Sequence, residues 1–205
     1  MNPTLVILAA GASRRLGQPK VLARVLTDQD GKHKTVLDWL LETSLGLCQN
    51  KPLLVAGADH GPIQAACAGE PLEVLHHPAW DQGRTGSIAA AVRARTGQDL
   101  LLWPADSPCL HRRDLETMIA AFLKADSPPR GWIAPRCPDG RFGHPLILGR
   151  ELLARVAEMR PDQPLRDLRG HAQPLGAVDL YHSGTRINLD TPAALEEVRS
   201  WFREA

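Results

Sequence analysis

Apolar segments of strand length alternate with amphipathic, helix-like segments over about the first 125 residues of this chain. Residues 4–8 (TLVIL) and 100–103 (LLLW) are continuous apolar runs, which are typical of strands buried on both faces of a sheet. Parallel strands must be joined by crossover connections, and helices usually form them. The alternation therefore predicts an α/β fold with a doubly wound, mostly parallel sheet and helices on both faces.

The remaining expected elements continue this pattern. Further strands are expected at residues 53–56, 73–75, 132–135, 146–148, 175–179 and 186–189. Helices are expected at residues 36–47, 62–68, 85–94, 112–124, 150–159 and 192–202, with Thr35 capping the first and Pro192 opening the last. The strands after residue 125 predict a small antiparallel extension in the C-terminal half, within a single domain over residues 1–205.

Charge and cysteine content argue against several classes of protein. The formal net charge is +1 without a polybasic block, which argues against a broad nucleic-acid-binding face. The four cysteines form no C-x-x-C pair, so neither a zinc knuckle nor a disulfide framework is expected. No apolar stretch approaches the ~18–20 residues of a membrane span, and no positive charge precedes the apolar run at residues 5–10 as it would in a signal peptide. We expect a cytoplasmic protein with reduced thiols that binds neither nucleic acid nor a membrane.

A small, basic loop follows the first strand. Residues 8–20 read LAAGASRRLGQPK, in which Gly11 permits close backbone approach and Ser13 offers a hydroxyl. Arg14, Arg15 and Lys20 can donate to phosphate oxygens. The spacing fits neither a Walker A loop nor G-x-G-x-x-G. The loop is therefore a candidate phosphate site of another type, although an ordinary strand-to-helix turn with solvated arginines has the same composition.

Carboxylates follow two other expected strands. Asp106 comes directly after the strand at residues 100–103, and a carboxylate at a strand end is a plausible Mg²⁺ ligand. Asn188 and Asp190 lie at i and i+2 on an expected strand, which would place them on one face. Helix capping is the alternative for both segments.

The segment at residues 82–88 (QGRTGSI) is a further candidate binding loop. Gly83 and Gly86 allow close backbone approach. Ser87 lies near a helix N-terminus, where anions are stabilised.

The segment at residues 142–150 (FGHPLILGR) places Gly143, His144 and Pro145 between two expected strands. Taken alone, His144 is more typical of a surface turn than of a binding site.

Together these motifs resemble those of the nucleotidyltransferases built on a Rossmann-like sheet. The first loop is similar to their signature L-A-A-G-x-S-x-R-[ML]-G-x-x-K, Asp106 and Pro108 fit their L-x-D-x-P element, and residues 187–192 (INLDTP) fit their D/N-I-D/N-T-P element. The match is best to the group similar to molybdenum-cofactor cytidylyltransferases, whose G-[HN]-P element fits residues 143–145. It extends through nearly the whole chain.

The resemblance implies a role for each matching residue. Implied catalytic residues are Arg15, Lys20 and Asp106. Implied nucleotide-binding residues are Leu8, Ala9, Ala10, Gly11, Ser13, Arg14, Gly83, Gly86 and Ser87, in a nucleotide-binding half at residues 1–125. Implied acceptor-binding residues are Gly143, His144 and Pro145, in an acceptor-binding half at residues 126–205. Asp106 would bind Mg²⁺ together with Asn188 or Asp190.

The resemblance also implies a reaction. An enzyme of this group transfers CMP from CTP to the phosphate of molybdopterin and releases pyrophosphate, and a molybdoenzyme is an expected partner. Ala10 and Pro19 favour cytosine, because guanylyltransferases tend to have L-A-G-G and an acidic residue before the lysine. The group's G-D-x-G-x-R element is altered at residues 160–169 (RPDQPLRDLR), where Asp162 and Arg166 remain without the glycines.

Three hypotheses follow for the function. The first is molybdopterin cytidylyltransfer. The second is nucleotidyltransfer to a sugar phosphate or another small phosphate, or guanylyltransfer to molybdopterin. The third is a non-catalytic chaperone that binds a nucleotide or cofactor for a molybdoenzyme.

Overall fold

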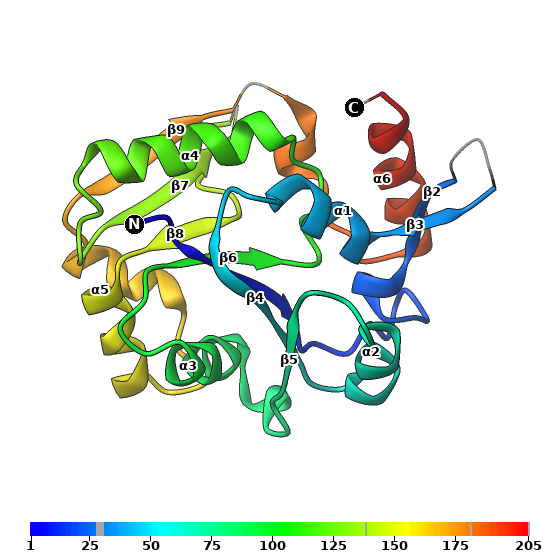
Figure 1. Ribbon diagram of the computed structural model, residues 1–205, viewed down its shortest axis with the longest axis horizontal. Helices are drawn as coiled ribbons and strands as arrows, with labels where there is room; N and C mark the ends of the chain where they lie inside the picture. Colours follow the sequence, from blue (N-terminus) through cyan, green and yellow to red (C-terminus); the bar gives the residue numbers. More distant parts are fainter. Residues whose placement is uncertain (28–30, 138, 181, 205) are drawn as a thin grey trace.

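A seven-stranded sheet forms the centre of the protein (Figure 1). The computed structural model describes residues 1–27, 31–137, 139–180 and 182–204. The strands are β1 (Thr4–Ala9), β2 (Arg24–Thr27), β3 (His33–Thr35), β4 (Gln49–Ala56), β5 (Glu73–His76), β6 (Leu100–Pro104), β7 (Trp132–Arg136), β8 (Leu146–Leu148) and β9 (Leu175–Asp179). Their order in the main sheet is β5-β4-β1-β6-β8-β7-β9, and β2 pairs with β3 in a separate hairpin.

The direction of the strands confirms the predicted fold class. Strands β5, β4, β1 and β6 are parallel, whereas β8 runs antiparallel to both β6 and β7. In register, Val6 of β1 lies between Leu53 of β4 and Leu102 of β6. The sheet is thus a doubly wound parallel sheet with the expected antiparallel extension in its C-terminal half.

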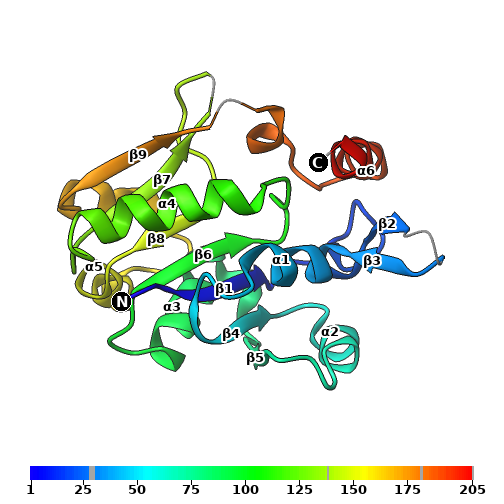
Figure 2. The ribbon, with the colours of Figure 1, turned by 45° about the horizontal axis from the view of Figure 1, so that its top comes forward.

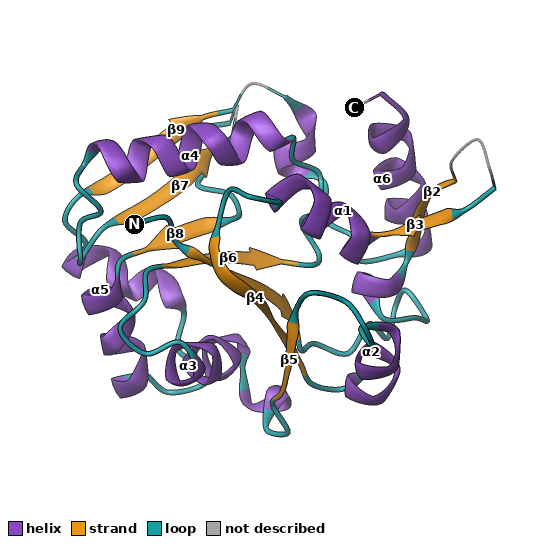
Figure 3. Ribbon diagram, viewed as in Figure 1, coloured by secondary structure: helices purple, strands orange, loops and turns teal. Residues whose placement is uncertain are grey.

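Helices cover both faces of this sheet, which is visible in Figure 2 and, by colour, in Figure 3. They are α1 (Val36–Ser44), α2 (His60–Ala66), α3 (Arg84–Ala94), α4 (Arg112–Lys124), α5 (Arg150–Ala154) and α6 (Pro192–Glu204). The hydrophobic core on one face includes side chains of α1, α4 and α6, and the core on the other face includes side chains of α3 and α5.

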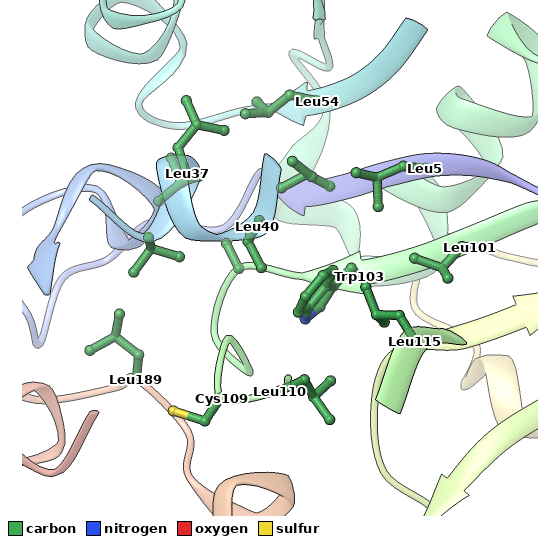
Figure 4. Packing of buried hydrophobic residues seen from close by; sticks show 14 of the residues in the cluster. Leu5, Leu37, Leu40, Leu54, Leu101, Trp103, Cys109, Leu110, Leu115 and Leu189 are labelled. Carbon is green, nitrogen blue, oxygen red and sulfur yellow. The ribbon is translucent and has the colours of Figure 1, made fainter. Parts of the chain in front are cut away.

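Alternating residues of β1 show why this arrangement suits the sequence. Leu5 and Ile7 belong to the core under α1 and α4, and Val6 belongs to the core under α3 and α5. Figure 4 shows Leu40 of α1, Trp103 of β6 and Leu115 of α4 together in the first of these cores. A strand covered by helices on both faces is apolar along most of its length, and this accounts for the run LVIL at residues 5–8.

The strand order also fixes where a ligand would bind. The chain passes from β1 to β4 on one side and reaches β6 on the other side of β1, so the order reverses between β1 and β6. Crevices at such a switch point, beyond the carboxyl ends of the strands, are the usual ligand sites of open α/β sheets. The loop after β1 and Asp106 after β6 both lie there.

Several expected boundaries are confirmed. Helix α4 and strands β8 and β9 have the predicted bounds. Thr35 caps α1 as predicted, because its hydroxyl accepts from the backbone N–H of Asp38 and the Asp38 carboxylate accepts from the Thr35 N–H. The helix ends at Ser44 rather than at residue 47, since Gly46 has a φ of 73°, which no helix can continue.

Two expectations about strands were wrong. Residues 186–189 form no strand: a 3₁₀ turn at Ser183–Arg186 precedes an irregular segment. The apolar alternation there reflects the burial of Ile187 and Leu189, which fill the core without a neighbouring strand to pair with. The hairpin of β2 and β3 was not expected, because its two strands are short and β3 (HKT) is polar.

Two further features of the structure are its free thiols and the lengths of its helices. All four cysteines are free thiols, and burial raises the pKa values of Cys48 and Cys109 to about 12. Within the described ranges, no helix combines the length and the apolar character that crossing a membrane requires.

Candidate active site

A cavity of about 420 Å³ lies at the switch point, between the ends of β1 and β6 and the N-terminus of α3. It brings together residues that are far apart in the sequence. Of the predicted site residues, it is lined by Leu8, Ala9, Ala10, Gly11, Ser13, Arg15, Lys20, Ser87, Asp106 and Asp190. We call it the first cavity.

The loop after β1 is held in shape by Ser13. The Ser13 carbonyl accepts from the N–H groups of Leu16 and Gly17, and its hydroxyl accepts from the Lys20 N–H at 3.1 Å. Gly17 takes a φ of 77°, which favours glycine. By contrast, a Cβ on Gly11 would meet no protein atom within 4 Å, so packing does not require this glycine. The space beside Gly11 is open to the first cavity.

Two carboxylates and three cations converge in this cavity. Lys20 Nζ donates to Asp190 Oδ1 at 2.5 Å and lies 3.9 Å from Asp106 Oδ2. Arg15 lies 3.3 Å from Asp190 Oδ2, and Arg84 lies 3.5 Å from Asp106 Oδ2. The hydrogen bond from Lys20 lowers the pKa of Asp190, so that carboxylate is ionised at neutral pH. The same cations could bind phosphate oxygens if a divalent metal bound the carboxylates.

The predicted metal ligands are only partly brought together. Asp106 and Asp190 share Lys20 and line the first cavity, whereas Asn188 is exposed and lines a neighbouring cavity of about 280 Å³. The Ser107 hydroxyl lies between them, 3.2 Å from Asp106 Oδ1 and 3.0 Å from Asn188 Oδ1, and can donate its one proton to either oxygen. The expectation that Asn188 and Asp190 share a strand face was wrong, because the Asp190 N–H donates to the Asn188 carbonyl in a tight turn.

The chemistry of these donors still suits Mg²⁺. The described residues contain no group of three or more His, Cys, Asp or Glu placed to hold a metal. Two carboxylates and a nearby amide oxygen nevertheless match the way Mg²⁺ is held in phosphate-transfer sites, where substrate phosphates and water complete its ligand shell.

The segment carrying Asn188 and Asp190 is anchored from both sides. The Leu189 N–H donates to the Asp106 carbonyl at 2.8 Å, which ties the segment to the end of β6. Upstream, His182 Nε2 lies 2.9 Å from the buried carboxylate of Asp114 on α4. Burial would raise the pKa of Asp114, but the hydrogen bonds from His182 and from the His111 N–H outweigh it and lower that pKa.

Gly83 before α3 and Gly86 in its first turn contact the protein rather than the first cavity. Gly83 has a φ of 140°, and a Cβ there would lie 2.2 Å from the Pro161 carbonyl oxygen. That carbonyl accepts from the N–H groups of Thr85 and Gly86 at 3.1 and 3.4 Å. The glycines thus allow the segment at residues 161–163 to close over the helix N-terminus, and neither glycine lines the first cavity. Arg14 does not line it either.

A second cavity of about 300 Å³ adjoins the first and shares Leu8, Arg84 and Pro104 with it. Gly143 and His144 line this second cavity, while Pro145 is buried beside them. Burial lowers the pKa of His144, so its ring is neutral at neutral pH. The two cavities therefore offer neighbouring places for two substrates.

Arg84 and Trp80 are among the residues lining these cavities that were not predicted as site residues. Arg84, the first residue of α3, lines both cavities. In the sequence it is only a basic residue between two glycines, and no motif marks it. Trp80 lines the first cavity and packs on Gly57, where a Cβ would lie 2.5 Å from the Trp80 Cβ. In the sequence, residues 77–83 (HPAWDQG) also resemble an N-P-x-W-x-x-G segment of the same family, and this motif could have identified Trp80.

Comparison with known proteins agrees with this geometry. The family model described as the MobA-like NTP transferase domain matches residues 5–175. The molybdenum cofactor cytidylyltransferase of Escherichia coli (strain K12) is 27% identical over 191 residues, covering 91% of this chain and 90% of that protein.

Two solved structures share the fold. Rv0371c from Mycobacterium tuberculosis H37Rv, in complex with manganese, superposes with a TM-score of 0.71 at 23% identity and covers 98% of this chain and 99% of its own. CMP:2-keto-3-deoxy-manno-octonic acid synthetase, complexed with CTP, has a TM-score of 0.70 at 14% identity and covers 100% and 99%.

Proposed function

Because this chain belongs to the family of MobA-like NTP transferase domains, we propose that it transfers CMP from CTP to the phosphate of molybdopterin. The chain is a nucleotidyltransferase of this family, and the choice of CTP and molybdopterin follows its cytidylyltransferase relative. The observation that carries the proposal is the convergence of Lys20 with Asp106 and Asp190 beside an open glycine loop at the switch point.

In the proposed reaction, an oxygen of the acceptor phosphate attacks the α-phosphorus of CTP. The bond from that phosphorus to the bridging oxygen of the β-phosphate breaks, and pyrophosphate leaves. The attacking phosphate is already an anion, so no strong general base is required. Catalysis then depends on positioning and on neutralising the charge of the phosphates.

Some residues of the first cavity would contact the base of the nucleotide, and others would bind its phosphates. Leu8, Ala9 and Ala10 at the end of β1 would lie against cytosine, and the small side chain of Ala10 leaves room there. Arg15 and Lys20 would bind the β- and γ-phosphates and stabilise the departing pyrophosphate. Arg84, which lines both cavities, is placed to bind the α-phosphate or the acceptor phosphate.

Asp106 and Asp190 would hold Mg²⁺, and Asn188 is close enough to Asp106 through Ser107 to assist them. When bound, the ion would act as a Lewis acid on phosphoryl oxygens. Lys20 would then be released from the carboxylates and could turn its ammonium group toward the phosphates.

The second cavity would hold the acceptor, with Gly143, His144 and Pro145 on one side. The free thiols support the proposal that the protein works in the cytoplasm, where cysteines remain reduced.

A thermal-shift experiment with CTP, GTP, UTP and ATP, each with Mg²⁺, tests the nucleotide assignment. We expect CTP at 100 times its Kd to raise the unfolding free energy by about 2.7 kcal/mol, which corresponds to a rise in Tm of roughly 5–10 °C for a chain of this size. The other three nucleotides should give smaller shifts at the same concentration. A larger shift with GTP would overturn the cytosine assignment, and no shift with any nucleotide would overturn the nucleotide site.

A further inference from the structure

Several hydrogen-bonding groups around the second cavity have no partner within the protein. Among the described residues, five buried side-chain nitrogen or oxygen atoms lack one, and three of them belong to residues that line this cavity. They are Trp132 Nε1, His144 Nδ1 and Arg169 Nε. Leaving a buried donor unpaired costs about 1–3 kcal/mol, so such a cluster indicates groups that are reserved for a ligand.

Arg169 is held in place without its Nε–H being used. Its guanidinium carbon lies 4.6 Å from the ring centre of Phe142 and 5.3 Å from that of Trp132. Cation–π contact with these two rings fixes the position of the side chain, while Nε stays buried without an acceptor. The guanidinium is therefore positioned in advance for a ligand that accepts hydrogen bonds.

The type of these groups limits the ligand. An indole N–H and a guanidinium N–H can only donate, so the ligand must bring acceptor atoms such as a carbonyl oxygen or a ring nitrogen. Ile88, Leu102 and Leu146 line the same cavity and suit the apolar faces of a flat ring. Arg84 and Arg166 also line it and suit an attached anion. A sugar has no flat face and is rich in hydroxyl groups, so it would fit this lining poorly.

We propose that Arg169 and Trp132 are specificity-determining residues that bind the planar, carbonyl- and nitrogen-bearing ring of the acceptor in the second cavity. This proposal rests on the proposed function, because it takes the second cavity to be the acceptor site. The anionic end of the acceptor would then point toward Arg84, which also lines the first cavity. The acceptor phosphate would thereby face the α-phosphorus of the nucleotide.

The test uses pterin-6-carboxylate, a fluorescent flat heterocycle with an anionic group, and glucose 1-phosphate, an anion without a flat ring. The full chain is titrated with the pterin and followed by the pterin's own fluorescence, and the sugar phosphate is added as a competitor. Arg169→Gln and Trp132→Phe are compared with Arg155→Gln, which removes an exposed arginine outside this cavity. Binding of CTP with Mg²⁺ is measured separately for each protein, both as a check of folding and as a test of the first cavity.

We expect the unaltered chain to bind the pterin in preference to the sugar phosphate. Arg169→Gln should weaken pterin binding about tenfold or more, and Trp132→Phe, which keeps an aromatic side chain but removes the indole N–H, about three- to tenfold. Arg155→Gln should change it less than twofold, and all variants should bind CTP normally.

Pterin affinity that is unchanged in both Arg169→Gln and Trp132→Phe would overturn the proposal. So would the absence of pterin binding to a chain that binds CTP, or displacement of the pterin by an equal concentration of glucose 1-phosphate. If instead the proposed function is wrong, the chain would not bind CTP, whereas its pterin binding would still depend on Arg169.

Discussion

Asp106→Ala is expected to lower kcat by about 10³-fold while the protein remains folded. The carboxylate follows β6, between Lys20 and Arg84, and lines the first cavity. Its loss would remove a proposed metal ligand next to the reacting phosphates. The side chain is partly exposed and lies outside the hydrophobic cores, so the change in unfolding free energy should be small by comparison.

Asp99→Ala is the matched control. Asp99 directly precedes the same strand at its opposite end, where its carboxylate accepts from the backbone N–H of Arg150 and pairs with the side chain of that residue. This variant should lower the melting temperature and leave kcat within about twofold, because the lost contacts are structural and distant from the cavities. Normal turnover in Asp106→Ala, with kcat and melting temperature measured for both variants, would contradict the metal assignment.

Lys20→Met is expected to have two opposite effects. Turnover should fall by about 10²- to 10³-fold, because a cation that stabilises the phosphates is lost. Metal binding in the absence of nucleotide should become about tenfold tighter, because Lys20 and a metal ion compete for the oxygens of Asp106 and Asp190. A tenfold change is 1.4 kcal/mol, well within the ~4 kcal/mol that two unit charges 4 Å apart exchange near a protein surface.

Titration with Mn²⁺, followed by electron paramagnetic resonance, measures the second effect directly. Lys51→Met, which removes an exposed lysine at the start of β4, should change neither turnover nor Mn²⁺ affinity. Weaker Mn²⁺ binding in Lys20→Met would mean that Lys20 supports the metal site instead of competing with it, and the proposed exchange of Lys20 between carboxylates and phosphates would be wrong.

The sequence was most informative where a residue's role depends on its immediate neighbours. The run at residues 4–8 predicted a buried parallel strand, since a strand covered on both faces is apolar along most of its length. Thr35 and Asp38 form a capping box that needs only local geometry, and the expected cap was confirmed. Asp106 could be placed at the switch point because it follows an uninterrupted buried strand.

The sequence was least informative where a role depends on contacts between distant segments. Gly83 and Gly86 suggested an anion site, but Pro161 covers them from far along the chain. Arg84 and Arg169 gain their positions from neighbours in other elements, which no local pattern encodes. Ile187 and Leu189 give the sequence the apolar–polar alternation of a strand, because the burial of these two side chains alone produces that pattern.

The most direct test of the central claim follows the nucleotide itself. CTP labelled at the α-phosphorus is incubated with the full chain, Mg²⁺ and molybdopterin, and both the labelled product and the released pyrophosphate are measured. We predict that label moves to the acceptor with one pyrophosphate released for each label transferred, and that this requires the divalent metal. Absence of label transfer from CTP and from GTP, UTP and ATP, each labelled at the same position, would contradict the assignment of this site to nucleotidyl transfer onto molybdopterin.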